Sequence, residues 1–332
     1  MPTMNDVALA AKVSTATVSH VLNGTRTVHP DTARAVKAAI AAVGYTPNIL
    51  ARSLARSASS TIGVAIAAVS NHYFAGTVHA IEDECRRLGL AMIFVDTHDE
   101  PAQELEAVKT LHQRRVDGIL LAPTSDPERR VLNYLEAANV PTVLVDRLGP
   151  KGFDQVGVEN VESTAQMVAH LVGHGHRRIG FIAGAMGLAT SVERLQGYRL
   201  ALERAGLPFD DALVRGGQSM IEPARAAVRE LLALAAPPTA IVTANNLMTI
   251  GAVSAIREAG LAIPGAMAVV GFDDFDWADY FEPRLTVMAQ PVKDIGLRAV
   301  KLLNKRIKTP NGARQTVRLA PTFVVRRSCG CA

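Results

Sequence analysis

A short run close to the N-terminus, TATVSHVLN at residues 15–23, places small hydrogen-bonding side chains on one predicted helix. One face of this helix holds Val18, Val21 and Leu22, and the other holds Thr15, Ala16, Ser19 and His20. Short side chains let a protruding helix approach the base edges in the major groove of duplex DNA, and His20 can contact a base there. The run therefore predicts a DNA-reading helix, and the alternative is an ordinary solvated polar face.

A second set of polar side chains follows the apolar runs of the later sequence. Its members are Asn71, Tyr73, Phe74, Asp146, Arg147, Arg194, Asn245, Asp273 and Gln290. Ligands of open α/β sheets bind beyond the carboxyl ends of the strands, where these residues are expected. Carboxylates, amides, a guanidinium group and an aromatic face suit a polyhydroxylated ligand. Taken singly, Asp146 and Arg147 could simply form an ion pair, and Tyr73 could be ordinary core, but jointly the residues favour a ligand site.

The remaining reactive side chains predict no further site. Three histidines lie between residues 170 and 176, but no Cys or carboxylate joins them at ligand spacing, so no metal is expected. Cys329 and Cys331 lie in CGC at the C-terminus, where we expect a frayed and inert end. Neither a catalytic set nor a dinucleotide or phosphate-binding loop stands out, so we expect no cofactor and no enzymatic activity.

The positive charge of the chain is confined to its first 60 residues. There, six basic side chains accompany two acidic ones, whereas the rest of the chain holds 29 of each. The net charge of +4 therefore belongs to one small segment, which favours a polyanionic partner for that segment alone. Judged by charge only, a solvated basic face is an equal alternative.

Composition indicates a folded cytoplasmic protein. A chain of 332 residues with 48% hydrophobic content can bury two ordinary cores. The apolar runs are much shorter than the roughly 20 residues of a membrane span, and the N-terminus has no secretory pattern, so no membrane partner is expected. Three cysteines are too few for a disulfide framework.

The first 46 residues predict three short helices, near residues 5–11, 15–22 and 30–43. Ser14 can cap the second helix, which Gly24 ends, and Pro30 suits the first position of the third helix. Val36 and other apolar residues of the third helix recur at helical spacing. They provide an apolar face against which the other two short helices can pack.

After residue 60, apolar runs alternate with amphipathic stretches. Runs such as TIGVAIAAV, PTVLVD and AMAVVGF are apolar throughout, which is typical of parallel strands buried on both faces. We expect an α/β core of two doubly wound parallel-sheet subdomains. The expected segments are 1–46 for the helical head, 47–59 for a hinge, 60–161 with 291–323 for the first subdomain, and 162–290 with 324–332 for the second.

Motifs of a known family recur along nearly the whole chain. They include VSTATVSHVLNG, TPNILARSLAR, VSNHYF, RVDGILLAP, HGHRRIGFIAG, ERLQGYR and VVGFDDF. In these motifs the chain resembles LacI/GalR-family transcriptional regulators, its head being most similar to purine-repressor-like members and its sensor to sugar-sensing members. The resemblance implies a helix-turn-helix head and a periplasmic-binding-protein-like core. It also implies that Thr15, Ala16 and His20 contact bases with Arg26 beside them, and that Thr17, Ser19 and Asn23 contact phosphates.

Two head residues depart from the family pattern, and the hinge has a role of its own. Lys12 stands where Gly or Asn is usual, and His29 replaces the usual Ser cap of the third helix. About nine residues after Pro47 cannot hold a helix alone in water. The resemblance implies that this hinge helix pairs with its twin in the minor groove, where Ala51 and Leu54 contact DNA and Leu54 wedges between base pairs. The alternative is a flexible linker.

Together these observations predict a homodimeric repressor of double-stranded palindromic operator DNA whose affinity a small effector controls. The effector is expected to be a sugar such as ribose, with a hexose or a sugar acid next, and Arg147 argues against a flat purine. Two rival interpretations remain: a soluble sugar-binding protein without DNA-directed regulation, and a nucleotide-dependent α/β enzyme.

Overall fold

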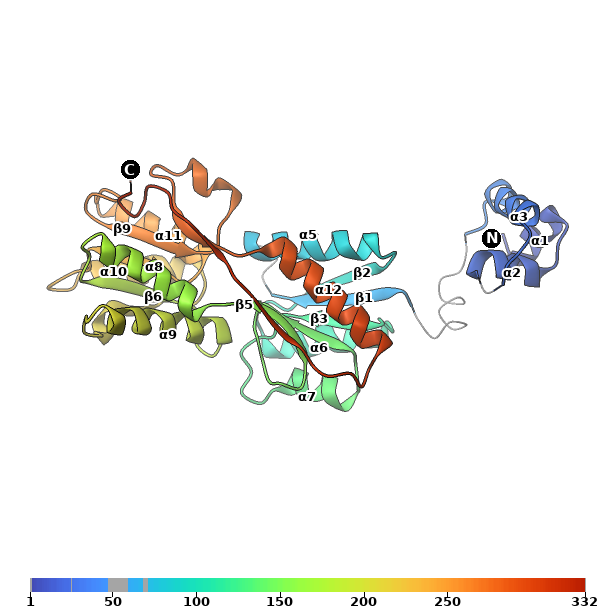
Figure 1. Ribbon diagram of the computed structural model, residues 1–332, viewed down its shortest axis with the longest axis horizontal. Helices are drawn as coiled ribbons and strands as arrows, with labels where there is room; N and C mark the ends of the chain where they lie inside the picture. Colours follow the sequence, from blue (N-terminus) through green and yellow to red (C-terminus); the bar gives the residue numbers. More distant parts are fainter. Residues whose placement is uncertain (1, 25, 47–58, 68–70, 332) are drawn as a thin grey trace. The chain divides into compact units, whose positions relative to one another are not determined.

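The computed structural model describes residues 2–24, 26–46, 59–67 and 71–331. The chain divides into two compact units, Met1–Ser60 and Thr61–Ala332. Figure 1 shows the helical first unit in blue and the larger second unit in the remaining colours. The expected hinge helix, with Ala51 and Leu54, lies outside the described residues.

The first unit contains helices α1 (Met4–Ala11), α2 (Thr15–Asn23) and α3 (Pro30–Val43). Ser14 caps α2, because its Oγ accepts a hydrogen bond of 3.1 Å from the backbone N–H of Thr17. Gly24 and Gly44 end α2 and α3 in the left-handed conformation, with φ of 63° and 66°, a conformation that glycine adopts without steric cost. These starts and stops confirm the helices expected from the sequence.

A small apolar core holds the three helices together. Its buried members are Val7, Ala8, Val18, Val36 and Ala39. Val18 is the only fully buried residue of α2 among those described, so the helix turns one side toward this core. The side of α2 that carries its small polar residues is turned away from this core.

The second unit contains two six-stranded sheets. The first has the order β11-β5-β4-β3-β1-β2 and is parallel throughout. Its strands are β1 (Thr61–Ile66), β2 (Ala91–Asp96), β3 (Gly118–Leu121), β4 (Thr142–Val145), β5 (Asp154–Val158) and β11 (Thr316–Leu319). The second sheet has the order β12-β10-β9-β8-β6-β7, and β12 alone is antiparallel to its neighbour. Its strands are β6 (Ile179–Ala183), β7 (Val214–Gly216), β8 (Ala240–Thr243), β9 (Ala268–Phe272), β10 (Thr286–Ala289) and β12 (Thr322–Val324).

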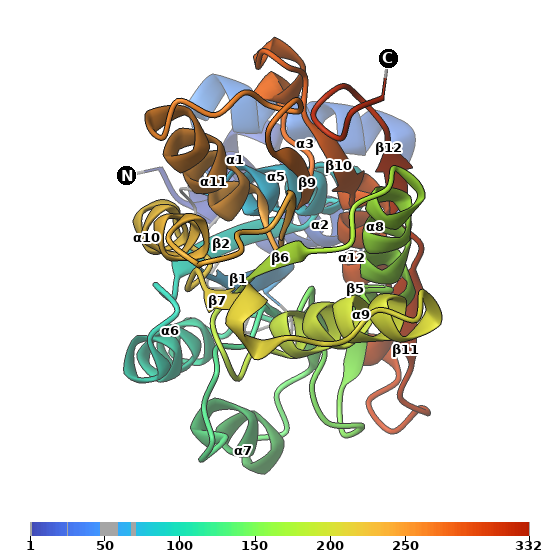
Figure 2. The same cartoon turned by 90° about the vertical axis from the view of Figure 1, so that its left-hand side faces the viewer.

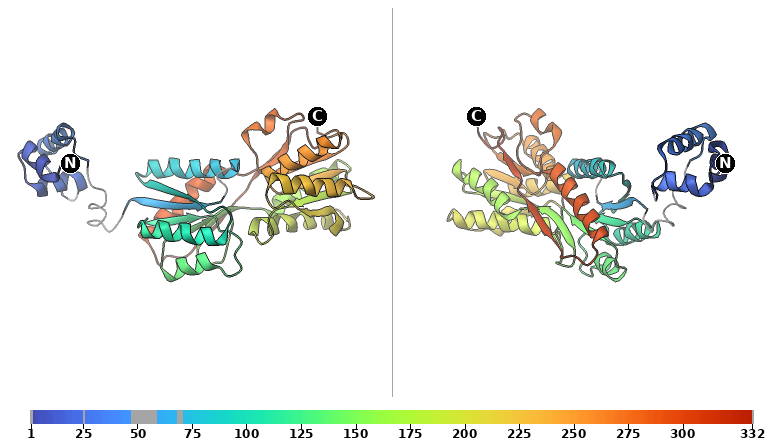
Figure 3. Two further views of the ribbon diagram at one scale, coloured as in Figure 1. Left: turned by 180° about the vertical axis from the view of Figure 1, so that it is seen from behind. Right: turned by 45° about the vertical axis from the view of Figure 1, so that its right-hand side comes forward.

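Helices cover both faces of each sheet, as Figures 2 and 3 show. The first sheet carries α5 (His72–Arg87), α6 (Pro101–Gln113), α7 (Arg130–Ala137) and α12 (Val292–Lys308), and the second carries α8 (Val161–Gly173), α9 (Ala189–Arg204), α10 (Ile221–Leu232) and α11 (Asn246–Glu258). Val64 of β1 lies in the same apolar cluster as α5 and α12, whereas the adjacent Ala65 lies in the cluster of α6 and α7. Burial on both faces explains why this run is apolar at every position.

The chain crosses between the sheets three times. It passes from β5 to α8, from β10 to α12 and from β11 to β12. The last crossing differs from the expectation that the first subdomain extends to residue 323, because Thr322 and Phe323 already pair with β10 of the second sheet. Within the described part of the chain, no helix is both long and apolar enough to span a bilayer.

Candidate nucleic-acid interface and ligand site

The side chains expected at DNA lie on α2 and shortly after it. They are Thr15, Ala16, Thr17, Ser19, His20, Asn23 and Arg26. Thr15, Ala16 and Arg26 are exposed, whereas Ser19 and His20 are half-buried. Small exposed side chains at the start of a helix permit close approach to a groove. Thr15 and Ala16 are therefore accessible at the start of α2, and Ala51 and Leu54 are not among the residues that the structure describes.

Two of the residues assigned to phosphates are held by neighbours on the same helix. The Oγ1 of Thr17 lies 2.9 Å from the Oγ of Ser14, next to the helix cap. Asn23 donates from its Nδ2 to the Oγ of Ser19 at 3.1 Å. These contacts fix rotamers before any partner arrives, which lowers the entropy lost on binding.

Both departures from the family pattern have a structural counterpart. Lys12 has a φ of 54°, which is left-handed backbone, and it forms the end of α1. A side chain with a Cβ is strained in this conformation by about 1–2 kcal/mol. His29 precedes α3 without a capping hydrogen bond from its side chain.

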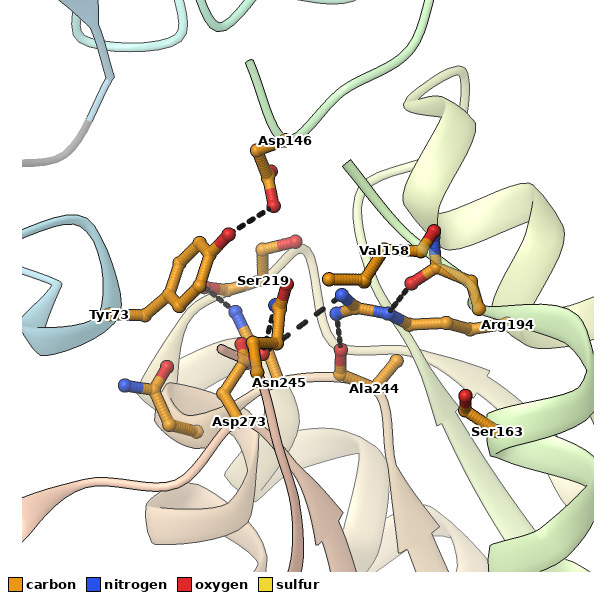
Figure 4. Close-up of polar contacts among 12 residues, drawn as sticks. Tyr73, Asp146, Val158, Ser163, Arg194, Ser219, Ala244, Asn245 and Asp273 are labelled. Carbon is orange, nitrogen blue, oxygen red and sulfur yellow. Dashed lines mark hydrogen bonds and ion pairs between the residues drawn. The ribbon is translucent and has the colours of Figure 1, made fainter. Parts of the chain in front are cut away.

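All nine residues predicted for the ligand site are buried, with exposed fractions between 3% and 9%. They come from loops and helix starts at the carboxyl ends of strands in both sheets. Asp146 follows β4 of the first sheet, Asp273 follows β9 of the second, and Arg194 lies on α9. Figure 4 shows Tyr73, Asp146, Arg194, Asn245 and Asp273 in one region.

Tyr73 and Asp146 form the part of the site contributed by the first sheet. The Tyr73 hydroxyl donates to Asp146 Oδ1 at 2.6 Å. Burial, and then the nearby negative charge of Asp146, hold the pKa of Tyr73 well above its ordinary value. The phenol therefore stays protonated and serves as a donor to the carboxylate, leaving the other oxygen of Asp146 as an acceptor for further groups.

Asp146 and Asp273 adopt the same unusual backbone conformation. Their φ angles are 66° and 70°, and each residue directly follows the last position of a central strand. Non-glycine residues in this region cost free energy and are concentrated at functional sites. The two carboxylates thus occupy equivalent strained positions at the ends of two sheets.

Arg194 is held in a buried cradle made by the second sheet and its loops. Its guanidinium carbon lies 3.7 Å from the centre of the Phe272 ring, which is a cation–π contact. Its Nε donates to Asn160 Oδ1 at 2.9 Å, and its Nη1 donates to the Ala244 carbonyl oxygen. A third nitrogen, Nη2, lies 4.0 Å from Asp273 Oδ1. The planar group is therefore fixed in orientation beside a carboxylate.

Asp273 is the most deeply buried carboxylate of the site. Gln290 donates from Nε2 to Asp273 Oδ1 at 2.6 Å. Burial raises the pKa of Asp273, and the nearby Arg194 charge and the Gln290 hydrogen bond oppose that rise. Among the described residues, the buried Oε1 of Gln290 has no hydrogen-bond partner. A buried acceptor without a partner indicates a place for an added donor.

Arg147 is placed differently from the other predicted residues. It forms two hydrogen bonds with the carboxylate of Asp99, the longer being 3.0 Å from Nη2 to Oδ2. Its Nε is 4.0 Å from Asp146, and its guanidinium group lies 5.7 Å from the Phe74 ring. The main ion-pair partner of Arg147 is therefore Asp99 and not Asp146, which was the alternative considered from the sequence. Arg147 also lines a pocket of about 320 Å³ whose other walls include Gly187 and Leu188 of the second subdomain.

Two asparagines connect the halves of the site. Asn246 donates from Nδ2 to Asn71 Oδ1 at 2.8 Å, and this bond joins the start of α11 to the start of α5. Asn245 instead caps α11 and donates to the Ser219 carbonyl oxygen at 3.1 Å. Asn245 was predicted as a ligand contact, and its side chain also forms hydrogen bonds with the backbone of α11 and of Ser219.

Sequence reasoning missed Asp99 and Asn160. Asn160 follows β5, so the rule that selected Asp146 would have selected it had DQVGV been identified as a strand. Asp99 lies three residues after β2, in a loop where both His98 and Asp99 have positive φ, and no sequence signal points from it to Arg147.

The C-terminal cysteines are not on a frayed end, contrary to expectation. Cys329 is fully buried, and Cys331 Sγ lies 3.2 Å from the Nε2 of His174. A cysteine therefore does lie beside the histidines in the fold, although none joins them at ligand spacing in the sequence. Cys331 is 157 positions from His174 and 161 from His170, so spacing along the chain gave no signal.

Two family models match the chain. Residues 3–48 match the model described as bacterial regulatory proteins, lacI family, and residues 168–329 match the periplasmic binding protein-like domain. These ranges correspond to the three-helix unit and to most of the second sheet with the returning segment.

Curated relatives cover the whole chain. The HTH-type transcriptional repressor PurR of Photobacterium profundum is 33% identical and spans 99% of this chain and 98% of its own length. The ribose operon repressor of Escherichia coli (strain K12) is 34% identical and spans 99% of this chain and 100% of its own length.

Solved structures agree with these relatives. The lac repressor dimer bound to operator and the anti-inducer ONPF has a TM-score of 0.89 and 28% identity, and the match covers 99% of both chains. The chain therefore belongs to the LacI family, as a transcriptional repressor in which a helix-turn-helix unit precedes a periplasmic-binding-protein-like ligand-binding domain.

Proposed function

We propose that this repressor binds a palindromic operator as a homodimer and that a sugar, most favourably an aldopentose such as ribose, sets its affinity for that operator. The observation that carries the proposal is the burial of Asp146, Asp273 and Arg194 together at the strand ends of two sheets. Fixed carboxylate acceptors beside a fixed guanidinium donor match the vicinal hydroxyls of a sugar.

Unused hydrogen-bonding capacity supports the same ligand class. The Oε1 of Gln290 is buried without a partner in the described part of the chain, and a sugar hydroxyl would satisfy it. Tyr73 packs edge-on against Phe74, with ring centres 5.0 Å apart, and supplies an aromatic surface for the C–H side of a sugar ring. The 34% identity to a ribose operon repressor agrees with this choice.

A purine is the rival ligand, because relatives at 33% identity are named PurR. A flat base is best held between aromatic faces. The guanidinium group of Arg147 lies over the face of Phe74, whereas the Tyr73 ring meets Phe74 edge-on, and the charge of Arg147 is matched by Asp99. This arrangement favours a hydroxyl-rich ligand over a base.

On the DNA side, the exposed start of α2 supplies Thr15 and Ala16, with His20 behind them, for base edges in the major groove. Thr17, Ser19 and Asn23 would contact phosphates, and Ala51 and Leu54 the minor groove. A two-fold operator matches a two-fold dimer, and the similarity to a lac repressor dimer bound to operator supports this pairing.

The DNA-binding half is tested by fluorescence anisotropy with a palindromic duplex. The full chain is expected to bind the duplex with steep salt dependence, and a version that begins at Ser60 is expected not to bind. Equal binding by both versions, or none by either, would leave a soluble sugar-binding protein without DNA-directed regulation as the better interpretation.

The ligand half is tested on the same full chain by thermal unfolding with pentoses, hexoses, sugar acids and purine bases. Ribose is expected to raise the midpoint of unfolding, and to keep raising it with the logarithm of its concentration above the dissociation constant, because it binds the folded state alone. A shift with purines and none with sugars would reject the sugar assignment.

A further inference from the structure

Two histidines at the end of α8 point toward the chain's C-terminus. His170 and His174 lie one helical turn apart, and their ring centres are separated by 4.7 Å. His170 is half-buried against the Phe323 ring of β12, at 5.1 Å between centres, whereas His174 is exposed. The pair thus presents two imidazole nitrogens from one helix face.

The C-terminal segment is docked firmly beside these histidines. The Ser328 carbonyl oxygen accepts from Val269 N at 2.8 Å, and its Oγ accepts from Thr286 N at 2.8 Å. The Thr286 hydroxyl donates to Cys329 Sγ at 3.2 Å, and Cys329 is fully buried. These bonds to β9 and β10 fix the backbone that carries Cys329 and Cys331.

Three of the four side chains converge, and the fourth, His174, contacts Cys331. Cys331 Sγ lies 3.5 Å from His170 Nε2 and 3.2 Å from His174 Nε2. The donor atoms of His170, Cys329 and Cys331 all lie within 4.8 Å of one another. In a tetrahedral zinc site, sulfur at about 2.3 Å and nitrogen at about 2.1 Å from the metal are roughly 3.6 Å apart. The two separations from Cys331 to the histidine nitrogens are therefore close to those of a Cys₂His₂ ligand set, which His174 would complete beside the cluster of His170, Cys329 and Cys331.

We propose that His170, His174, Cys329 and Cys331 form a structural zinc site that fastens the C-terminal segment to α8. Two sulfurs and two imidazole nitrogens are the donors that Zn²⁺ prefers, and they close a tetrahedral site. Both thiols release their protons as Zn²⁺ binds, so the neutral cluster becomes a neutral complex and two protons enter the solvent.

The site would stabilise the second subdomain at one defined place. One end of α8 begins beside Asn160, which holds Arg194 of the ligand site, and the other end carries the two histidines. A metal at that second end joins α8 to β9 and β10 through the docked tail. Binding to the folded state alone would then raise the midpoint of thermal unfolding.

The test uses the reduced, metal-free full chain, titrated with Co²⁺ and then with Zn²⁺. We expect one Co²⁺ per chain, a thiolate-to-cobalt charge-transfer band with tetrahedral ligand-field bands, displacement of Co²⁺ by Zn²⁺, and a higher unfolding midpoint with Zn²⁺. Because Cys331 is half-exposed and His174 is exposed, Cys331→Ser and His174→Gln should fold, which circular dichroism checks.

Loss of a residue that only orients a metal ligand typically weakens metal affinity roughly 10-fold to 100-fold. Each of these two variants removes a ligand itself and should weaken Zn²⁺ binding by more than that. His176→Gln is the matched control, because this histidine follows the same helix but its Nδ1 faces Thr239 Oγ1 at 2.9 Å. Its metal affinity should equal that of the parent chain.

Two results would overturn the proposal. If the reduced chain binds neither metal with a thiolate signature, the cluster consists only of thiol–imidazole hydrogen bonds. If Cys331→Ser and His174→Gln both keep the parent affinity, the metal binds elsewhere in the chain.

Discussion

The carboxylate of Asp273 lies where its charge is poorly solvated. It is 3% exposed, and its closest cation, Arg194, is 4.0 Å away. Burial accordingly raises its pKa above that of an unfolded aspartate. Between the two pKa values the folded protein binds more protons than the unfolded chain, so the free energy of unfolding falls as the pH rises through this interval. At neutral pH this buried carboxyl group therefore costs stability relative to acidic pH.

Asp273→Asn should separate ligand binding from stability. Asn keeps the shape, accepts the hydrogen bond from Gln290 and tolerates positive φ. Without a buried charge, the ligand-free variant should unfold at a higher temperature than the parent at neutral pH, and the difference should shrink as the pH falls toward the pKa of an unfolded aspartate. Ribose affinity should drop roughly 10-fold to 100-fold, because a hydrogen bond to a charged acceptor contributes about 1.5–3 kcal/mol.

Thermal unfolding across pH, with and without ribose, measures both effects. The exposed Asp211 provides a control, since Asp211→Asn should change neither quantity. A variant of Asp273 that is less stable than the parent at neutral pH, or that binds ribose as well as the parent, would contradict the role given to this carboxylate.

At this scale the sequence predicted positions better than partners. All nine residues predicted for the ligand site are buried, and all but Arg194, which lies within α9, follow the end of a strand, because the strand-end rule depends only on finding the strands. The pairing of Arg147 with Asp99 could not be predicted, since it depends on the path of a loop with two left-handed residues. The meeting of Cys331 with His174 likewise depends on how the tail crosses the second sheet.

At the scale of elements, α5 and α12 approach closely on one face of the first sheet. A Cβ placed on Gly296 of α12 would lie 2.7 Å from the Cβ of Ala80 and 2.8 Å from the backbone of α5. Because backbone cannot move aside as a flexible side chain can, this contact requires glycine.

Gly296→Ala should destabilise the second unit by about 1–3 kcal/mol, since it overpacks this helix contact. Gly76→Ala is the control on the facing helix, where a Cβ would lie 3.7 Å from Val292 in ordinary contact. That substitution should stabilise α5 by about 0.5–1 kcal/mol through the lost freedom of the unfolded chain. Urea denaturation of both variants gives the comparison, and equal stability of the two would refute the close packing.

The cap of α2 gives a second test among the elements. Ser14→Ala removes the acceptor for the Thr17 N–H and should cost about 1 kcal/mol of stability in the first unit. Ser14→Asn keeps a capping side chain and should restore it. Amide hydrogen exchange of α2 is the measurement, because it follows this unit apart from the larger one. Unchanged exchange rates in Ser14→Ala would show that the cap contributes little.

Strands were predictable where they are central and were missed where they are short or polar. Runs such as DGILLAP became β3, because a strand buried on both faces must be apolar throughout. DQVGV (β5) and VRG (β7) carry polar residues or span three positions, so no periodicity marks them. β12 follows β11 after two residues but joins the other sheet, a choice that tertiary packing makes.

At the scale of the whole molecule, the proposed function requires that ligand binding in the second unit is energetically coupled to DNA binding by the first unit. The two subdomains are joined at the site by the Asn246–Asn71 hydrogen bond, in addition to three chain crossings. A ligand that bridges Asp146 and Asp273 would change the balance between arrangements of these subdomains. Its effect on DNA affinity must then be matched by an effect of DNA on ligand affinity.

Ribose and operator should therefore alter each other's affinity reciprocally. If ribose changes operator affinity of the full chain by a factor in the range of roughly 5-fold to 150-fold, saturating operator should change ribose affinity by the same factor and in the same direction. A version starting at Ser60 should bind ribose with the affinity of the DNA-free full chain, because it lacks the unit that senses DNA. Titration calorimetry with ribose, at a fixed salt concentration and with and without operator, measures both affinities. Because linkage requires the two factors to be equal at equilibrium, the size of the factor is the decisive result. A factor of one in both titrations would mean that ribose does not set operator affinity.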